Sequence, residues 1–209
     1  MDWDRGFKMR KIIVASNNSN KIREIKDILN NLPVEILSLN EVGINIEIEE
    51  NGNTFLENAF IKAEKIFDIS SGTMVLADDS GLAVDSLGGA PGIYSARFSG
   101  EHGDSKKNNE KLLNMLRGKD LCDRKASFIC AMVLIAENGE VIEVEEKIDG
   151  VIIGEERGTN GFGYDPVFYL EDYKQTFAEM ESELKNKISH RARALTKLQQ
   201  EIERLLRRG

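Results

Sequence analysis

Residues 75–85 read Val-Leu-Ala-Asp-Asp-Ser-Gly-Leu-Ala-Val-Asp, and this stretch carries the strongest structural signal in the chain. The apolar run from Met74 to Ala77 predicts a buried strand that ends in two adjacent carboxylates, Asp78 and Asp79. Neighbouring carboxylates repel each other unless positive charge lies beside them, and a divalent cation is the usual partner. Carboxylates with few other ligands suit Mg²⁺, which commonly serves phosphate chemistry. The alternative is an Asx turn at the strand exit, which needs only one aspartate.

The segments around this strand alternate between strand and helix patterns. Residues 12–15 predict a short buried strand, a polar cluster follows at 16–21, and isoleucines and leucines then recur at helical spacing until Pro33. The remaining candidate strands are 36–39, 44–48, 126–136, 141–147 and 151–153, and the candidate helices are 54–69, 108–116 and the segment after Ser189. The capping-box patterns are Thr54-Phe-Leu-Glu57 and Thr176-Phe-Ala-Glu179. Residues 81–92 predict a loop, and Asn138-Gly139 a hairpin turn. This order predicts an α/β fold with a mixed central sheet flanked by helices.

Composition narrows the class of protein. The chain has 209 residues, of which 41% are hydrophobic, enough for one substantial core in one domain or two joined lobes. A net charge of -8 argues against a protein that grips a nucleic-acid polymer. The longest apolar run, 128–136, is too short for a membrane span, and Cys122 and Cys130 match no zinc spacing. We expect a cytoplasmic protein with no membrane partner, in which residues 1–8 form an upstream start or a disordered lead.

Two polar clusters on the N-terminal side suit phosphate and metal binding. Residues 16–21 read Ser-Asn-Asn-Ser-Asn-Lys where a strand passes into a helix, so backbone N–H groups there are placed to bind an anion. A capped helix start explains this cluster about as well. Glu50 precedes the helix that carries Lys62. We interpret Glu50 as a candidate metal ligand and Lys62 as a candidate phosphate-binding residue. The alternative there is a solvated acidic turn before a capped helix.

Two further clusters suit recognition of a base. Residues 161–166 read Gly-Phe-Gly-Tyr-Asp-Pro, in which Phe162 or Tyr164 is placed to stack on a nucleobase. The alternative is an aromatic anchor that pins the loop. His190 and Arg191 follow Ser189 at a helix start and present hydrogen-bond donors, which suit a keto oxygen and reject an exocyclic amine. The alternative for a lone histidine is a structural or surface role.

Six motifs in order make the chain resemble the inosine triphosphatase family, in its bacterial type. They lie at 16–21, 49–59, 77–85, 89–98, 161–166 and 189–192. Asn17 departs from the glycine that family members often carry, and residues 1–8 have no counterpart. The resemblance implies a single inosine-triphosphatase-like domain over 9–209, with two lobes and an active-site cleft between them, and a homodimer.

The resemblance also implies an activity, namely hydrolysis of ITP, dITP and XTP to the monophosphate plus pyrophosphate, with Mg²⁺ as cofactor. By motif position, Asp79 is the general base and a metal ligand, Glu50 is the second ligand, and the role of Asp78 stays open. The substrate-binding residues by the same carry-over are Ser16, Asn17, Asn18, Ser19, Asn20, Lys21, Lys62, Ser80, Phe162, Gly163, Tyr164, Asp165, Lys185, His190 and Arg191. The implied partner is a purine nucleoside triphosphate.

Two alternatives remain beside this interpretation. A related pyrophosphatase acting on other modified nucleotides, such as the septum-formation inhibitor family, has a similar fold but should lack the segment at 189–191. A non-catalytic nucleotide sensor would bind a triphosphate tightly without turnover, and the presence of Glu50 and Asp79 argues against it.

Overall fold

The structure is a computed structural model that describes residues 9–208, so the expectation for residues 1–8 lies outside the described residues. The chain divides into two compact units, which are described in turn. Within the described residues, the first unit comprises 9–79, 131–145 and 194–208, and the second comprises 80–130 and 146–193. The expected active-site cleft stays a prediction.

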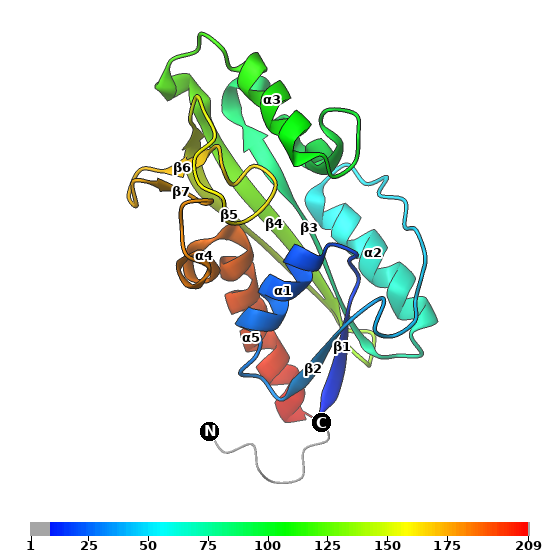
Figure 1. The fold of residues 1–209 in the computed structure, drawn as a ribbon. Coiled ribbons are helices and arrows are strands. Elements are labelled where there is room, and N and C mark those ends of the chain that lie inside the picture. The colour runs from blue at the N-terminus through cyan, green and yellow to red at the C-terminus, as the bar shows by residue number, and fades with distance from the viewer. Residues whose placement is uncertain (1–8, 209) are drawn as a thin grey trace. The chain divides into compact units, whose positions relative to one another are not determined.

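The first unit begins with a strand–helix–strand–helix–strand series (Figure 1). It runs through β1 (Arg10–Val14), α1 (Ser19–Ile28), β2 (Val34–Ser38), α2 (Phe55–Ile69) and β3 (Met74–Val84). β1 pairs in parallel with β2 on one side and with β3 on the other. Since parallel crossovers are right-handed and these two run in opposite directions, α1 and α2 cover opposite faces of the sheet.

Packing on the α2 face explains why this helix forms where it does. Thr54 is the N-cap, and its side chain accepts from the Glu57 amide, while the Glu57 carboxylate reaches back to the Asn53 amide. The buried core on this face consists of Ile13, Ala15, Leu39, Ala59, Ala63, Ile66, Val75, Ala77, Val133 and Ile135. The small side chains of Ala59 and Ala63 let α2 approach β3 closely. This close approach also brings the buried polar residues beside them on the helix, Asn58 and Lys62, near β3.

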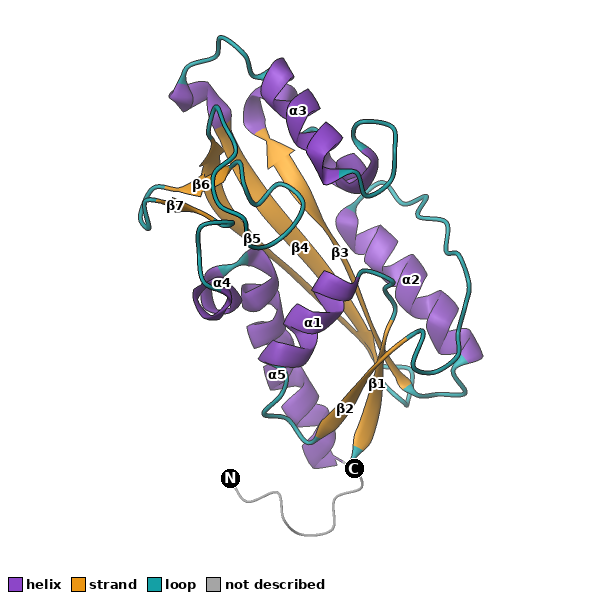
Figure 2. Cartoon of the chain, viewed as in Figure 1, coloured by secondary structure: helices purple, strands orange, loops and turns teal. Residues whose placement is uncertain are grey.

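The remaining elements are α3 (Ser105–Met115), β4 (Lys125–Ile135), β5 (Val141–Ile152), β6 (Phe168–Leu170), β7 (Gln175–Thr176), α4 (Ser182–Ile188) and α5 (His190–Arg208), with short 3₁₀ turns at Asp85–Leu87, Gly92–Arg97 and Leu121–Arg124. Figure 2 shows the loop that connects β5 to β6. The strands pair in the order β2-β1-β3-β4-β5-β6-β7, parallel at the β2 edge and antiparallel at the β7 edge. The predicted α/β fold with a mixed sheet is confirmed.

A second buried core belongs to the second unit. Its rings meet at Phe128, whose centroid lies 4.6 Å from Phe168 and 5.7 Å from Phe177. Leu82 and Val84 from the end of β3 join this core and are fully buried. No helix among the described residues is long and apolar enough to cross a membrane.

β3 differs from its prediction in a way that bears on function. The sequence predicted a strand ending at Ala77 and a loop over 81–92; the strand end was wrong, and the loop was wrong at 81–84 but holds for 85–92. The strand continues through both aspartates to Val84, because Leu82 and Val84 bury their side chains in the second core and keep the backbone extended. Asp78 and Asp79 therefore lie in the middle of an 11-residue strand rather than at its exit.

Two other local predictions were wrong for tertiary reasons. Residues 44–48 form no strand, although Ile44, Ile46 and Ile48 pack against the first core at the alternate spacing that suggested one. The Thr176–Glu179 box closes through two hydrogen bonds of 2.8 and 3.2 Å but begins no helix. The Ala178 carbonyl instead accepts from the amides of 159 and 160, which holds this segment as a turn.

Candidate active site

The polar cluster at 16–21 forms the exposed N-terminal start of α1 in the first unit. Asn18 is the N-cap, and its Oδ1 accepts from the amides of Asn20 at 3.0 Å and Lys21 at 3.2 Å. Ser16 Oγ accepts from the Asn18 amide at 3.2 Å. The N-cap therefore already occupies the amides of Asn20 and Lys21, so an anion could bind these amides only by displacing the Asn18 side chain.

Lys21 reaches from α1 to the first of the two aspartates. Its Nζ lies 3.1 Å from Asp78 Oδ2, and the Asp78 side chain is fully buried. A buried carboxylate requires a compensating charge, and Lys21 supplies it. The lysine keeps 14% of its side chain exposed, so the cation is held in place while staying accessible.

The second aspartate faces α2. Asn58 Nδ2 donates to Asp79 Oδ2 at 3.1 Å, and Lys62 Nζ lies 3.7 Å from Asp79 Oδ1. Asn58 is itself held by the Gly52 amide, which donates to its Oδ1 at 2.8 Å. Successive side chains on a strand point to opposite faces, so Asp78 and Asp79 project towards different helices. The adjacent pair is therefore not a chelating pair.

Glu50 completes the group around Lys62. Its Oε1 lies 2.8 Å from Lys62 Nζ, so one ammonium group contacts carboxylates from two distant segments. Burial alone would lower the pKa of Lys62, but the charges of Asp79, Glu50 and Asp78 raise it above its ordinary value. Burial raises the pKa of Asp79 above that of an ordinary aspartate, against the opposing effect of Lys62 and Lys21.

The donor set around Lys62 limits which metal sites are feasible. Among residues 9–208, no three acidic, histidine or cysteine side chains gather closely enough to hold a metal by themselves. Glu50 and Asp79 nevertheless converge on one cationic group. Two carboxylates suit Mg²⁺, which usually takes one or two protein carboxylates and completes its shell with water and substrate phosphates.

The base-binding candidates gather in the second unit. Arg191 is 1% exposed and donates from Nη2 to Ser80 Oγ at 2.9 Å. The His190 ring stacks on Phe128 with centroids 4.7 Å apart and an interplanar angle of 7°. Ser189 caps α5 by accepting from the Ala192 amide at 3.2 Å. This cap and the ring stack fix the direction of both donors at the start of the helix.

Asp165 organises the loop at 161–166 from within. It is 3% exposed, and its Oδ2 accepts from the Phe162 amide at 2.7 Å and from Lys185 Nζ at 2.6 Å. Gly161 has φ +74°, and a Cβ there would lie 2.1 Å from Asp165 Oδ2, so only glycine fits. The half-buried Phe162 ring lies 4.8 Å from Lys185 Nζ and 5.7 Å from Arg191 Cζ. Lys185 and Arg191 are thus placed around the ring predicted to stack.

Tyr164 lies differently from Phe162. Its ring is buried, its hydroxyl donates to the Ser95 carbonyl at 2.8 Å, and burial raises its pKa above the ordinary value. The anchor alternative therefore describes Tyr164, whereas the Phe162 ring is only half-buried and lies beside Lys185 and Arg191.

Sequence reasoning missed Asn58 and Asn109. Asn58 precedes Lys62 by one helical turn, and a buried polar residue at that spacing was the available signal. Asn109 is one of two consecutive asparagines on the buried side of α3, and it contacts Glu156 and Gly163. No local sequence pattern predicts contacts between residue 109 and residues as distant in sequence as 156 and 163.

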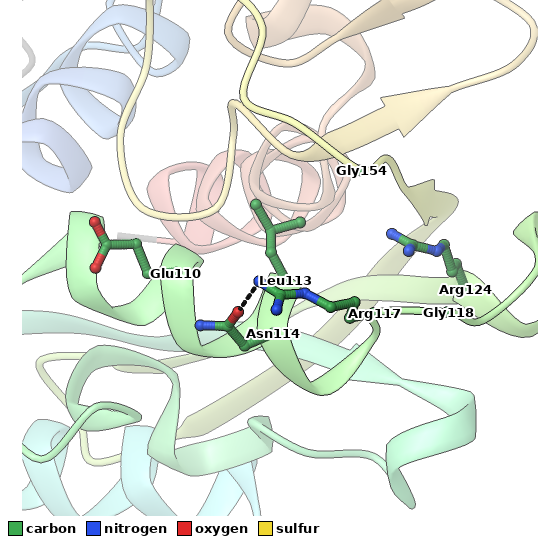
Figure 3. Close-up of a pocket in the computed structure, with 7 residues that line it drawn as sticks. All are labelled: Glu110, Leu113, Asn114, Arg117, Gly118, Arg124 and Gly154. Carbon is green, nitrogen blue, oxygen red and sulfur yellow. Dashed lines mark hydrogen bonds between the residues drawn. The ribbon is translucent and has the colours of Figure 1, made fainter.

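A pocket of about 330 Å³ opens elsewhere in the second unit (Figure 3). Its lining residues are Glu110, Leu113, Asn114, Arg117, Gly118, Arg124 and Gly154. Arg124 donates to the carbonyls of Leu116, Lys119 and Ile152, so it caps the end of α3. The lining contains none of the predicted site residues.

The chain is similar to a family of known proteins over most of its length. The model of the Ham1 family matches residues 12–201. The chain is 53% identical to a dITP/XTP pyrophosphatase of Clostridium perfringens, covering 95% of this chain and 100% of that protein. It is 47% identical to the Bacillus subtilis dITP/XTP pyrophosphatase, over 93% of this chain and 98% of that one. A solved HAM1 protein from Coxiella burnetii matches with a TM-score of 0.84 at 39% identity, covering 94% of this chain and 100% of that chain.

Proposed function

Because this chain belongs to the Ham1 family and is an enzyme that hydrolyses non-standard purine nucleoside triphosphates, we propose how its residues divide the reaction. The substrates are ITP, dITP and XTP, and the products are the monophosphate and pyrophosphate. The observation that carries the proposal is the convergence of Glu50 and Asp79 on Lys62 Nζ, at 2.8 and 3.7 Å. The carboxylates of Glu50 and Asp79, which come from distant segments, therefore contact the same ammonium group.

Glu50 and Asp79 are the residues that would hold Mg²⁺, since their oxygens already converge on one positive charge. When bound, the ion neutralises phosphate charge and lowers the pKa of a coordinated water. Asp78 is excluded from this pair because strand alternation turns it to the other face. Its contact with Lys21 gives it the role of positioning that lysine.

Asp79 acts as the general base for the attacking water. The water oxygen attacks the α-phosphorus, the bond to the oxygen bridging the α- and β-phosphates breaks, and Asp79 Oδ accepts the proton. Burial raises the pKa of Asp79 in the metal-free protein, and a bound Mg²⁺ would favour the charged carboxylate, which is the form that accepts a proton. Asn58 orients the carboxylate, which fixes the oxygen that faces the water.

Lys21, Lys62 and the start of α1 hold the triphosphate. Each lysine is paired with a carboxylate in this structure, so its ammonium group is already placed before a phosphate arrives. The side chains of residues 16–20, with Ser80, add neutral donors, while the amides of Asn18 and Asn20 already donate to Ser16 Oγ and Asn18 Oδ1. A protein of net charge -8 requires such local positive charge to bind a polyphosphate.

The second unit reads the base. Phe162 offers the stacking face, His190 and Arg191 donate to the keto oxygen of hypoxanthine or xanthine, and Lys185 completes the substrate site. Adenine carries an amine at that position, so donors would face donors, and sites of this kind discriminate by about 10⁴-fold or more. Tyr164, Gly163 and Asp165 hold the loop that carries Phe162.

The enzyme works on free nucleotides in the cytoplasm as a homodimer, and residues 9–209 act as one domain. The free cysteines Cys122 and Cys130 fit a reducing cytoplasm, and the family resemblance supports the homodimer and the single domain. The test of the whole proposal is release of pyrophosphate from ITP, XTP, GTP and ATP, measured side by side with Mg²⁺. We expect rapid release from ITP and XTP; orthophosphate as product, or equal rates with ATP, would contradict it.

A further inference from the structure

Asn109 stands out because it is buried, lies outside the predicted motifs and contacts the base-binding loop. It lies on α3 and is 2% exposed. Its Nδ2 donates to the Gly163 carbonyl at 3.2 Å and to Glu156 Oε1 at 2.7 Å. Its Oδ1 has no hydrogen-bond partner among the described residues. Rotating the amide would set an oxygen against two acceptors, so the donating orientation is the one that the surroundings support.

The contact falls on the one residue between the stacking ring and the anchor. Phe162 is held through its amide by Asp165, and Tyr164 is held through its hydroxyl by Ser95. Gly163 has φ +63°, and the space where a Cβ would lie is open. Because glycine has no side chain to pack, hydrogen bonds to its backbone hold it in place. Of the hydrogen bonds described here, the one from Asn109 fixes the Gly163 carbonyl.

The neighbouring asparagine serves a parallel purpose on the same helix. Asn108 accepts from the Ser99 amide at 2.7 Å and donates to the Ser95 carbonyl at 3.3 Å, the same oxygen that accepts from Tyr164. Consecutive residues of α3 thus hold the loop twice, once directly and once through Ser95. The helix therefore acts as a fixed support for the segment that carries Phe162.

We propose that Asn109 is a positioning residue that sets the placement of Phe162 through the Gly163 carbonyl and thereby the affinity for the purine base. The expected effect on KM rests on the proposed function, whereas the role of Asn109 in holding the loop does not. Loss of the contact should move KM and not kcat, because the reacting phosphate is handled by residues of the first unit. A general loss of folded protein would instead lower kcat and leave KM unchanged.

The test compares Asn109→Ala with Glu156→Ala. The first variant removes both hydrogen bonds of the amide, whereas the second removes only the bond to Glu156 and keeps the bond to Gly163. For Asn109→Ala we expect KM for ITP to rise about fivefold with kcat near wild type, the usual effect of one lost hydrogen bond. Glu156→Ala should keep the wild-type KM.

A double variant guards against misfolding of the single one. In Asn109→Asp with Glu156→Gln, residue 156 can donate to residue 109, but nothing donates to the Gly163 carbonyl. At a pH at which the carboxylate of residue 109 is charged, we expect this variant to show the raised KM of Asn109→Ala, and a thermal melt reports how far it stays folded. A wild-type KM in either variant that loses the Gly163 bond would overturn the proposal.

Hydrogen exchange of the ligand-free protein separates this inference from the proposed function. In Asn109→Ala the amides of 161–165 should exchange faster than in wild type, and in Glu156→Ala they should not. Unchanged exchange in Asn109→Ala overturns the positioning role. If wild-type enzyme released no pyrophosphate from ITP, the proposed function would fail, while the exchange experiment would still decide whether Asn109 holds the loop.

Discussion

Asp78 and Asp79 are consecutive on β3 but serve opposite faces of the sheet. Asp78 Oδ2 lies 3.1 Å from Lys21 Nζ of α1, whereas Asp79 Oδ2 accepts from Asn58 Nδ2 of α2 at 3.1 Å. Strand alternation separates two carboxylates that sequence adjacency suggested would act together. Their substitutions should therefore fail in different ways.

Replacing Asp79 by asparagine should remove the general base. We expect kcat for ITP to fall by about 10²–10⁴-fold, the usual contribution of acid–base catalysis, with little change in the melting temperature. Steady-state pyrophosphate release and a thermal melt measure the two effects. A kcat within a few-fold of wild type would reassign the base.

Replacing Asp78 by asparagine should release Lys21 rather than abolish chemistry. KM for ITP should then rise more than kcat falls, because the lysine loses the partner that holds it. In a double-mutant cycle with Lys21→Ala, adding Asp78→Asn should cost little further affinity, because the pair acts as a unit. Additive losses in KM would contradict the positioning role of Asp78.

Replacing Lys62 by methionine should leave Glu50 and Asp79 without the cation that they share. We expect lower stability without metal and a larger rise in melting temperature on adding Mg²⁺ than in wild type, because ligand binding stabilises the folded state. Thermal melts over a Mg²⁺ titration provide the measurement, and Lys65→Met on the same helix is the control. An equal Mg²⁺ response in the Lys62 variant and wild type would count against a shared position.

Replacing Arg191 by alanine should weaken the preference for ITP over ATP. The guanidinium is buried, donates to Ser80 and lies 5.7 Å from the Phe162 ring centroid. The ratio of kcat/KM for ITP to that for ATP is the readout, because a loss of folded protein lowers both values equally. Arg193→Ala, on the same helix turn but bonded to the carbonyls of Ile188 and Lys147, should keep the ratio. An unchanged ratio in Arg191→Ala would reassign base reading to the loop at 162–165.

Acid stability should depend on Glu41. Hydrogen bonds from the Ser38 amide and hydroxyl, with Lys26, lower the pKa of Glu41 from 4.5 to about 2. A carboxyl whose pKa is depressed on folding stabilises the protein above its unfolded pKa, and this contribution is lost as the pH falls towards 2. Denaturant unfolding of Glu41→Gln should therefore show a flatter decline between pH 4.5 and 2 than wild type. Parallel curves would show that Glu41 is not the group responsible.

Much of this molecule follows from local sequence. The capping box at Thr54, the hairpin turn at Asn138-Gly139 and α2 lie where their patterns predict, whereas α1 ends at Ile28, before the predicted end at Pro33. The mixed α/β fold, the family and the class of reaction follow as well. The reason is that helix starts, turns and core faces depend on residues a few positions apart, so a short window of sequence contains the cause.

Tertiary structure alone decided which partners the polar residues have. The length of β3 depends on a second core into which Leu82 and Val84 pack, and the separate partners of Asp78 and Asp79 come from α1 and α2. Tyr164 became an anchor because the Ser95 carbonyl, 69 residues away, accepts its hydroxyl. Such pairings depend on which distant groups the fold brings within hydrogen-bonding distance. Sequence therefore determined which polar residues this protein carries, and packing determined which of them share a partner, which pair with a lysine and which fix the loop.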